Sequence, residues 1–400
     1  MIPSDAGKLD EARRTIQIAG AGIAGLTAAL FLSAKGFRIE IHEKASAFET
    51  IGAGIQISPN AMNVLASLGL ERQLKTYATT PDSVTVFNAR NGEQLSRMPL
   101  GHIASKRYGH PYLVIHRADL HSVLISACKN NPDIEIRMDH EVIDATSHPN
   151  GVTVLVKAGT SAKEARGVAL IAADGVWSRT RTTALELPAA VDSGYCAWRS
   201  LIRSDTLEQF MTDNTNVWIT SGAHAVTYPV RNGRYVNAVI ITKGIDKELS
   251  PKLIHHELID KTKKFHRSIK SIVEQNSNWS AWPVWEMPSI TKMTGHSIVL
   301  IGDAAHAMLP FAAQGAAMAI EDAAVLASHL EPNCDIQAAL EKFEKERIPR
   351  VRKTMAFAKK NARIFHMRQP FSTFRNIGMA LMPEKAMLAR QDWLFNWKAE

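Results

Sequence analysis

The pattern of apolar and polar positions near the start of the chain predicts a strand, a helix and a second strand in succession. Residues 16–19 have the pattern of a short strand, residues 26–35 have the composition of a helix, and residues 37–43 alternate apolar and polar side chains. The second strand ends in an acidic residue, Glu43. This succession predicts a βαβ unit, the building block of parallel sheets.

The turn between the first strand and the helix contains Gly20, Gly22 and Gly25 in a G-x-G-x-x-G spacing. In such turns the first glycine permits the tight turn, the second lets a pyrophosphate approach the backbone, and the third allows close helix packing. The helix N-terminus offers amide donors to phosphates, and Glu43, about 20 residues further on, can hold ribose hydroxyls. The unit predicts a dinucleotide site; the alternative is that the glycines serve packing alone.

The next part of the chain does not repeat this unit. A helix is expected over about 118–129 and a strand over 134–138. The segments 151–159 and 167–173 have the pattern of two strands that pair with each other and lead into a turn at Asp174 and Gly175, with a helix just beyond. A plain Asp-Gly turn is the alternative to a functional role here.

Alternating apolar and polar positions then predict a mostly antiparallel sheet over 195–242. Asn232-Gly233, between two such runs, is a strong signal for a hairpin. Helical periodicity returns at 252–274, the nucleotide-domain pattern resumes at Ser297, and helices are expected from Ala338 to the end.

The predicted fold class is α/β, with a discontinuous Rossmann-like domain, an inserted mostly antiparallel sheet and a C-terminal helical region. The corresponding boundaries are 1–76, 104–185 and 289–335 for the dinucleotide domain, 77–103 and 186–288 for the substrate domain, and 336–400 for the C-terminal helices.

Composition narrows the class of protein. The chain of 400 residues is 46% hydrophobic, enough for sizeable cores, and no apolar run reaches the roughly 20 residues of a membrane span, so no stable membrane insertion is expected. The net charge of +8 forms no basic tract, which favours a small anionic ligand over nucleic acid. Cys128, Cys196 and Cys334 lie far apart, so we expect a reducing, cytoplasmic location and no metal site.

An acidic residue follows a buried-looking strand at 298–302. Asp303 comes directly after this strand, and a helix whose first turn is Gly315-Ala316-Ala317 begins near Gln314. Core packing alone does not require an acid at that position, and the carboxyl ends of parallel strands are where α/β proteins bind ligands. Small residues in the first turn leave backbone amides open to a ligand.

Three motifs together resemble the signatures of the group A FAD-dependent aromatic hydroxylases. They are GAGIAG from Gly20, DGVWSRTR from Asp174 and GDAAHAMLPFAAQG from Gly302, in the family's order. The resemblance extends from about Thr15 to Arg350 and is greatest to salicylate, hydroxybenzoate and hydroxynicotinate hydroxylases.

The resemblance implies an activity. FAD would be reduced by NADH or NADPH, and a flavin C4a-hydroperoxide would hydroxylate a small phenolic aromatic acid with molecular oxygen as co-substrate. A monomer or homodimer is expected. Alternatives are a larger polycyclic or quinone-like substrate, a flavin reductase or oxidase that yields hydrogen peroxide, and a flavin-bound module without turnover.

The resemblance also implies which residues contact FAD. The equivalent of Asp303 accepts hydrogen bonds from the ribityl chain, Asp174 and Gly175 lie near the pyrophosphate and ribose, and Arg117 reaches cofactor oxygens, although it could instead bridge Asp119. The full expected set is Gly20, Gly22, Ile23, Ala24, Gly25, Glu43, Lys44, Gly54, Arg117, Asp174, Gly175, Gly302, Asp303, Pro310, Gln314, Gly315 and Ala316.

Two side chains are the candidates for catalysis. His224 and Tyr228 are four residues apart in HAVTYPV, so on a strand both face the same side. We expect His224 to act as the base for a phenolic proton and Tyr228 to orient the substrate; the alternative is a half-buried strand with no such role. Arg199 and Trp198 face opposite sides, and either could line the pocket, while Arg199 could equally form a surface ion pair.

Three further features leave alternatives open. His306 is expected to cap or fix its loop rather than to catalyse. The family usually has an Asp-Arg pair before the last motif, but this chain has Glu286-Met287, so whatever that arginine supports is arranged differently here. The tryptophans at 279, 282 and 285 could form an aromatic lid or simply pack at the domain seam.

Overall fold

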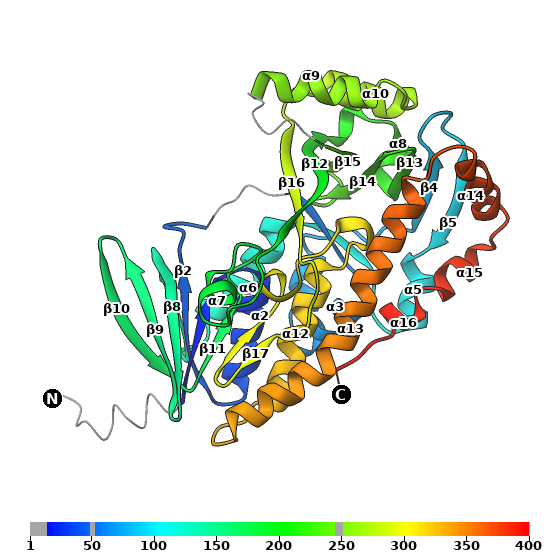
Figure 1. The fold of residues 1–400 in the computed structure, drawn as a ribbon. Coiled ribbons are helices and arrows are strands. Elements are labelled where there is room, and N and C mark those ends of the chain that lie inside the picture. Colours follow the sequence, from blue (N-terminus) through cyan, green and yellow to red (C-terminus); the bar gives the residue numbers. More distant parts are fainter. Residues whose placement is uncertain (1–13, 49–52, 245–250, 400) are drawn as a thin grey trace.

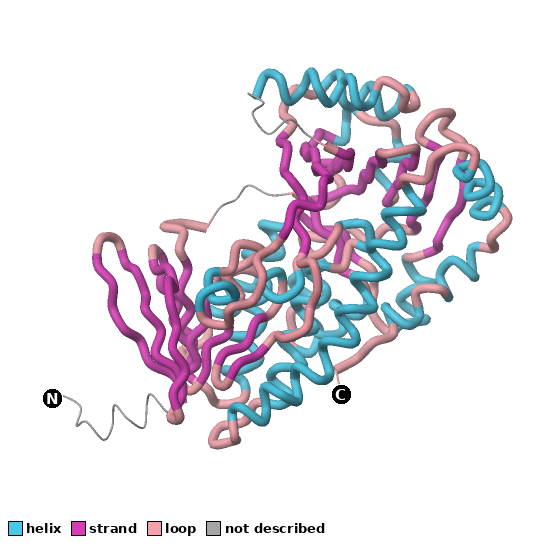
Figure 2. The backbone as a smooth tube through the Cα atoms, viewed as in Figure 1, coloured by secondary structure: helices cyan, strands magenta, loops and turns pink. Residues whose placement is uncertain are grey.

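The computed structural model describes residues 14–48, 53–244 and 251–399. Two large sheets lie in separate layers, and helices cover and connect them (Figures 1 and 2). No helix among the described residues is long and apolar enough to span a bilayer.

The first sheet carries the predicted dinucleotide motif. Its central strand β1 is buried along its whole length, as expected for a parallel strand covered on both faces. The strands are all parallel except for a short antiparallel edge strand. In spatial order they are β17 (Thr294–Gly295), β18 (Ile298–Leu300), β11 (Ala169–Ala172), β1 (Thr15–Ala19), β2 (Arg38–Glu43) and β7 (Ile134–Met138).

The predicted βαβ unit is confirmed, since β1, α2 and β2 follow one another and the two strands pair in parallel. Helix α12 packs on α2, on α3 and on the long α13. The helices of this layer, with the short ones at its rim, are α2 (Ile23–Ala34), α3 (Pro59–Ser67), α4 (Glu71–Lys75), α6 (Arg117–Lys129), α7 (Arg179–Thr183), α11 (Asp303–His306) and α12 (Gly315–His329).

The pairing predicted between 151–159 and 167–173 is wrong. Strand β11 lies between β1 and β18 in the parallel sheet, because its four residues are all buried and fit a sheet covered on both faces. The segment 151–158 instead forms the middle of a separate antiparallel sheet. That sheet consists of β8 (His140–His148), β9 (Gly151–Ala158) and β10 (Ser161–Gly167).

The second large sheet is mostly antiparallel, as predicted. The predicted hairpin at Asn232-Gly233 joins two of its strands, and Arg231, Asn232 and Gly233 all have positive φ there. In spatial order its strands are β16 (Ser280–Glu286), β12 (Val191–Arg203), β15 (Tyr235–Lys243), β14 (Ala223–Val230), β13 (Thr215–Thr220), β4 (Ser83–Asn88) and β5 (Gln94–Pro99). Within this sheet β13 and β4 pair in parallel, and the other neighbouring strands that the structure describes pair antiparallel.

One face of this sheet packs on helices of its own layer, and the other faces the dinucleotide layer. A two-stranded antiparallel sheet of β3 (Gly54–Ile57) and β6 (Leu113–His116) lies at the junction. The helices attached to this layer are α5 (Gly101–Tyr108), η1 (Ser204–Thr206), α8 (Gln209–Asp213), α9 (Pro251–Thr262) and α10 (Arg267–Gln275).

The C-terminal segment is helical, as expected. Helix α13 has 30 residues and so a length of about 45 Å; it runs from β17 of the first sheet to the second sheet, where His366, directly after the helix, contacts His224 of β14 (Figure 1). After it come α14 (Phe371–Ala380), α15 (Glu384–Ala389) and α16 (Asp392–Phe395), while α13 itself spans Ile336–Phe365. The parallel and antiparallel sheets with these helices confirm the predicted fold class.

Candidate active site

The glycine turn after β1 has the geometry of a phosphate site. Gly20 has a φ of +98°, and a Cβ atom there would lie 2.5 Å from the carbonyl oxygen of Ala173. A Cβ on Gly25 would lie 2.0 Å from the carbonyl oxygen of Gly20, so both positions require glycine. A Cβ on Gly22, in contrast, would meet nothing within 4 Å. The surface in front of the α2 N-terminus is therefore open to a ligand.

Glu43 lies beside this turn at the end of β2. Its two carboxylate oxygens accept hydrogen bonds from the amides of Ala21, at 2.8 Å, and Ala45, at 2.9 Å. Glu43 and Lys44 both line a cavity of about 200 Å³ that continues past Gly20 and Gly22. The first motif and the acid at the end of β2 thus share one cavity.

Asp174 and Gly175 form the opposite wall of the same cavity. Asp174 is held by Thr180, whose amide and hydroxyl both donate to its Oδ2 at 3.3 Å. The Oδ1 atom of Asp174 is buried and has no partner among the described residues, and burial raises the pKa of this carboxyl. Ser178 also caps α7 through the Arg181 amide at 3.0 Å, so the turn has a structural role as well.

Asp303 follows β18 and lies near the N-terminus of α12. A Cβ atom on Gly315 would lie 4.0 Å from Asp303 Oδ1. The side chain is accessible in the wall of a second cavity, of about 230 Å³. Burial raises the pKa of Asp303, while His306 and Arg117 act to lower it. An acceptor at a helix N-terminus inside a cavity suits a ligand with hydroxyl groups.

The loop between Asp303 and α12 presents Pro310 to the same cavity, in the short helix η2 (Pro310–Ala312). Gln314 at the start of α12 is buried, and its Nε2 donates to Ser58 Oγ at 3.0 Å. The first turn of α12 itself, with Gly315 and Ala316, is partly exposed.

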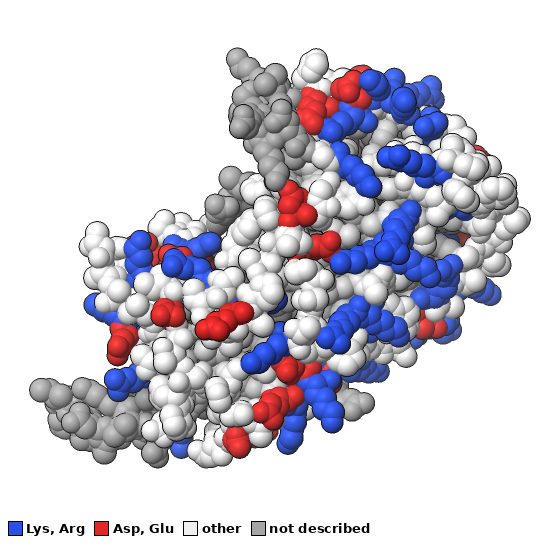
Figure 3. Space-filling model, in the orientation of Figure 1, with Lys and Arg blue, Asp and Glu red and all other residues white. Residues whose placement is uncertain are grey.

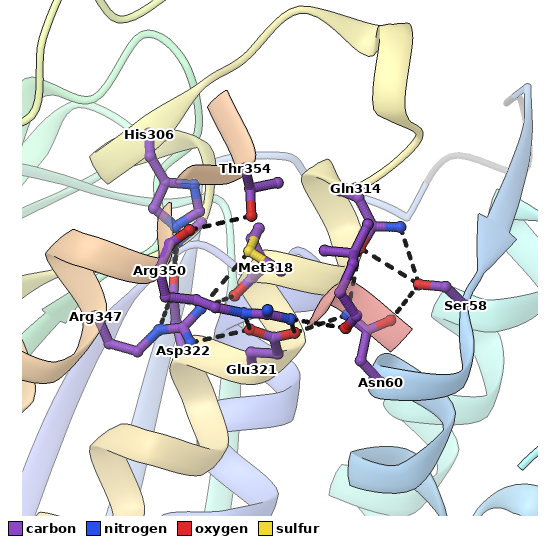
Figure 4. Close-up of polar contacts among 12 residues, drawn as sticks. Ser58, Asn60, His306, Gln314, Met318, Glu321, Asp322, Arg347, Arg350 and Thr354 are labelled. Atoms are coloured by element: carbon purple, nitrogen blue, oxygen red, sulfur yellow. Dashed lines mark hydrogen bonds and ion pairs between the residues drawn. The ribbon is translucent and has the colours of Figure 1, made fainter. Parts of the chain in front are cut away.

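A buried ionic network anchors this loop and helix from behind (Figure 4). Arg347 of α13 bonds both Glu321 and Asp322 of α12 at 2.9 Å, and Arg350 also bonds Glu321. Asp322 Oδ2 in turn bonds His306 at 2.5 Å and accepts the Gly302 amide at 2.9 Å. The loop-fixing role expected of His306 agrees with these contacts. The partners in α12 and α13 were missed by the sequence analysis.

The second wall of the 230 Å³ cavity is the sheet face that looks toward these loops. The strand register aligns Ala197 with Ile241 and His224 in one row of this face. Two residues further along β14, on the same face, comes Val226, and after it Tyr228. His224 and Tyr228 therefore do lie on one face, as strand spacing predicts.

Arg199 projects into this cavity. Its Nε is buried without a hydrogen-bond partner among the described residues, so the alternative of a surface ion pair is wrong. Burial lowers its pKa, and the nearby Arg117 acts in the same direction. Trp198 faces the other side, where its indole donates to Thr242 Oγ1 at 2.9 Å. The cavity lining thus contains both Arg199, whose Nε has no hydrogen-bond partner among the described residues, and Asp303.

Arg117 is exposed at the start of α6. The ion pair found for Asp119 is to Arg231, at 3.5 Å, and not to Arg117. Arg117 is close enough to Asp303 and Arg199 to affect the pKa of both. The position of Arg117 therefore agrees with the prediction that it faces the cofactor, and not with the alternative that it bridges Asp119.

Tyr228 is buried against Gly54, where a Cβ atom would lie 2.4 Å from the tyrosine ring. Only glycine fits at position 54, whose amide also donates to Asn237 Oδ1 at 2.6 Å. Burial raises the pKa of Tyr228, which Arg199 and Gln56 act to lower. Gln56 is also the acceptor for the hydroxyl of Tyr112. Asn237 and Gln56 were not among the predicted residues.

His224 lies in contact with η2 rather than among the residues that line the 230 Å³ cavity. Its ring is 2% exposed and packs on Phe311, with ring centroids 4.7 Å apart. Its Nδ1 lies 2.9 Å from Nε2 of His366, the residue that directly follows α13. Burial and His366 lower the pKa of His224 well below its usual value, so the ring is neutral near pH 7.

The two positions that depart from the family pattern have clear contacts. Glu286, at the end of β16, pairs with Lys359 of α13 at 2.9 Å. Met287 is buried, and its amide donates to the carbonyl of Ala307 at 2.8 Å. This segment therefore ties β16 to α13 and to the loop after Asp303.

The tryptophans at 279, 282 and 285 do not share one role: the first packs in a core and the other two line the cavity. Trp279 is buried in the core of the second layer. Trp282 is 57% exposed and, with Trp285, lines the cavity, where Trp285 packs edge-on against Trp177 at 4.4 Å between ring centroids.

Comparison with known proteins agrees with this geometry. A model of the FAD binding domain family matches residues 13–358. A 3-hydroxybenzoate 6-hydroxylase of Aquipseudomonas alcaligenes is 32% identical over 95% of this chain and 97% of its own length. A 6-hydroxynicotinate 3-monooxygenase of Pseudomonas fluorescens is 32% identical over 79% of this chain and 82% of its own.

Among solved structures, a salicylate hydroxylase in complex with its substrate is similar, with a TM-score of 0.80. It is 23% identical and covers 97% of both chains, which establishes the shared fold. The family match over most of the chain, the relatives above 30% identity and the two adjoining cavities that the three motifs line lead to one conclusion. The chain belongs to the FAD-dependent aromatic hydroxylases and is a flavoprotein monooxygenase.

Proposed function

We propose that the protein hydroxylates a small phenolic aromatic acid, of the salicylate, hydroxybenzoate or hydroxynicotinate kind, with NADH or NADPH as reductant. The observation that carries this proposal is Arg199, a cation without a hydrogen-bond partner at Nε, which lines the cavity together with Asp303. A buried cation without a partner is costly, and a substrate carboxylate would provide the missing partner. The names of the relatives support the same substrate class.

The residues present fit FAD. The open surface at Gly22, the unpartnered Oδ1 of Asp174 and the accessible carboxyl of Asp303 all lie along two cavities whose linings meet at 175–177. Gly22 and the α2 N-terminus would hold the pyrophosphate, and Glu43 a ribose. Asp303 would hold the ribityl chain, and the α12 N-terminus would face the ring. Bound FAD would supply the redox chemistry, since it can be reduced by NADH or NADPH and can then activate oxygen.

Substrate would lie between the sheet face and the Asp303 loop. Arg199 would bind the carboxylate and so set the direction in which the ring enters. Ala197, Met308 and Trp282 supply the less polar part of the lining. Apolar walls keep water from the reacting atoms.

The phenolic proton of the substrate would be removed at the row of strand residues that contains His224. His224 is neutral near pH 7 and can therefore accept a proton, and Tyr228 keeps its proton and can donate a hydrogen bond to the substrate oxygen. His224 Nδ1 lies 2.9 Å from His366 Nε2, so His366 would hold the orientation of the ring whose Nε2 atom takes up the proton. We assign His224 as the base and Tyr228 as the group that orients the substrate.

The proposal is tested by measuring NADH and NADPH consumption with salicylate, 3- and 4-hydroxybenzoate, 6-hydroxynicotinate and a polycyclic phenol, while peroxide and hydroxylated product are quantified together. We expect one of the aromatic acids to stimulate oxidation with a matching amount of product. Stimulation that yields peroxide alone would indicate an oxidase, and turnover of the polycyclic phenol only would overturn the substrate class.

A further inference from the structure

Helix α14 presents an apolar face to solvent. Phe371 is 65% exposed, Phe374 70%, Ile377 53% and Leu381, directly after the helix, 77%. Spacings of three, three and four residues place all of them on one side of the helix. Single exposed apolar residues are normal on soluble proteins, but four on one face mark an interaction surface.

The helix is held firmly in this orientation. Its inner side packs on β5, and Ser372 is buried. Arg375 donates through Nη1 to the last carbonyls of α13, those of Ile364 at 2.9 Å and Phe365 at 2.7 Å. Because these contacts fix the inner side, the apolar residues cannot turn inward without breaking them.

Basic residues outnumber acidic ones in the C-terminal helices to which this face belongs. Residues 351–400 contain ten Lys and Arg but three Asp and Glu, whereas the rest of the chain contains 37 and 36. The net charge is therefore concentrated in the C-terminal helices, although the basic residues form no tract. Arg368, Lys385 and Arg390 are exposed on both sides of α14 in the chain, and Figure 3 shows Lys and Arg gathered over α13 and its neighbours.

The size of the face and its charge limit what can cover it. Four partly exposed side chains offer roughly 500 Å² at most, so a second copy would also have to bury neighbouring basic residues to reach the ~800 Å² per partner of a stable protein interface. A second copy in a two-fold arrangement would also bring two positively charged surfaces together. A bilayer surface needs no shape complementarity, and anionic headgroups would neutralise the arginines and lysines.

We propose that α14 docks the protein reversibly on an anionic membrane surface. The side chains of Phe371, Phe374, Ile377 and Leu381 enter the headgroup region, while Arg368, Lys385 and Arg390 contact lipid phosphates. Each basic group near such a surface contributes about 1 kcal/mol, and salt screens this contribution. Docking therefore requires both anionic lipid and the apolar face, and it weakens as ionic strength rises.

The test uses the full-length protein loaded with FAD and co-sedimented with vesicles of phosphatidylcholine, with or without phosphatidylglycerol. We expect binding only to vesicles that contain phosphatidylglycerol, with loss of binding in high salt. A Phe371→Ser/Phe374→Ser variant should bind at least tenfold more weakly. Ile103→Ser is the matched control, because Ile103 is 55% exposed but lies on α5, and it should bind like the unchanged protein.

Other results would overturn the proposal. Equal binding to both kinds of vesicle would show that the basic residues do not contribute to docking. Binding to neither kind would show that α14 does not dock on a membrane. If light scattering shows a dimer that the Phe371→Ser/Phe374→Ser variant loses, a second copy covers α14 instead. Circular dichroism and thermal melting of each variant show whether it folds, and turnover of aromatic substrates is measured separately because docking does not depend on it.

Discussion

The Nδ1 atom of His224 lies 2.9 Å from the Nε2 atom of His366, although 142 residues separate them in the chain. Both rings pack on Phe311, the residue after Pro310 in the loop of the third motif. His366 directly follows α13, so the C-terminal helix, and not only the sheet, positions the partner of His224 Nδ1. The Nδ1 atom of His366 is itself buried without a partner among the described residues.

This pair gives a sharp prediction for His366. Burial lowers the pKa of His366 to about 4, so near pH 7 we expect it to orient His224 rather than to take up its proton. His366→Gln should therefore keep most of the hydroxylation rate, because an amide can still bond to the His224 ring. The affinity for substrate should change little. Rapid-mixing measurements of the phenolate absorbance of bound substrate across pH would report removal of the phenolic proton directly.

Substitution of His366 by phenylalanine separates relay from positioning. His366→Phe keeps the ring packing but removes the hydrogen bond, so both roles predict a loss. If His366→Gln is as active as the unchanged protein and only His366→Phe is impaired, His366 merely orients His224. If His224→Gln itself leaves coupled hydroxylation unchanged, the assignment of the base is wrong.

Arg199 is expected to set the preference for a carboxylate. Arg199→Met should raise KM for the aromatic acid about 10- to 100-fold, because a hydrogen bond to a charged group contributes ~1.5–3 kcal/mol. FAD content should not change. Arg203→Met, at the exposed end of the same strand, is the matched control. A carboxamide analogue that responds to Arg199→Met as strongly as the acid does would contradict the assignment.

Asp303 is expected to control FAD retention. Asp303→Ala removes an acceptor that lies at the N-terminus of α12, and we expect the dissociation constant for FAD to rise at least tenfold, with Asp303→Asn intermediate. Absorbance of the purified protein and titration with FAD after removal of the flavin would measure it. Stoichiometric FAD in Asp303→Ala would rule out the role.

The network behind α12 is expected to govern stability. Arg347→Met leaves Glu321 and Asp322 buried without their common cation, which should lower the free energy of unfolding by about 3–5 kcal/mol. Arg363→Met, on an exposed turn of the same helix, should change it by less than about 0.5 kcal/mol. Urea unfolding followed by fluorescence would compare the two, and equal losses would show that the network is not the cause.

Local patterns allowed the sequence to predict much of the fold. The βαβ unit, the Asn232-Gly233 hairpin and the facing of His224 and Tyr228 all depend on spacing within one segment. The pairing of β11 could not be predicted in this way, because a short, fully apolar strand has no periodicity that indicates which strand lies beside it. Spacing within one segment also could not predict that His366, Gln56 and Asn237 lie at the site, because tertiary packing brings them there. Glu321 and Arg347 were missed because charged residues on a helix usually face solvent.

Acid should destabilise the protein through its buried histidines. Burial lowers the pKa of His42 and of His366 from 6.5 to about 4. Between these values the unfolded chain binds a proton that the folded protein does not, so the free energy of unfolding falls as pH drops from about 6.5 to about 4 and changes little from this source below that. Each histidine contributes about 2–3 kcal/mol to the fall. His366→Phe removes one of the two groups, so urea unfolding of this variant at pH 7.5 and pH 5 should show a smaller pH effect than the unchanged protein; an identical effect would mean that His366 does not titrate in this range.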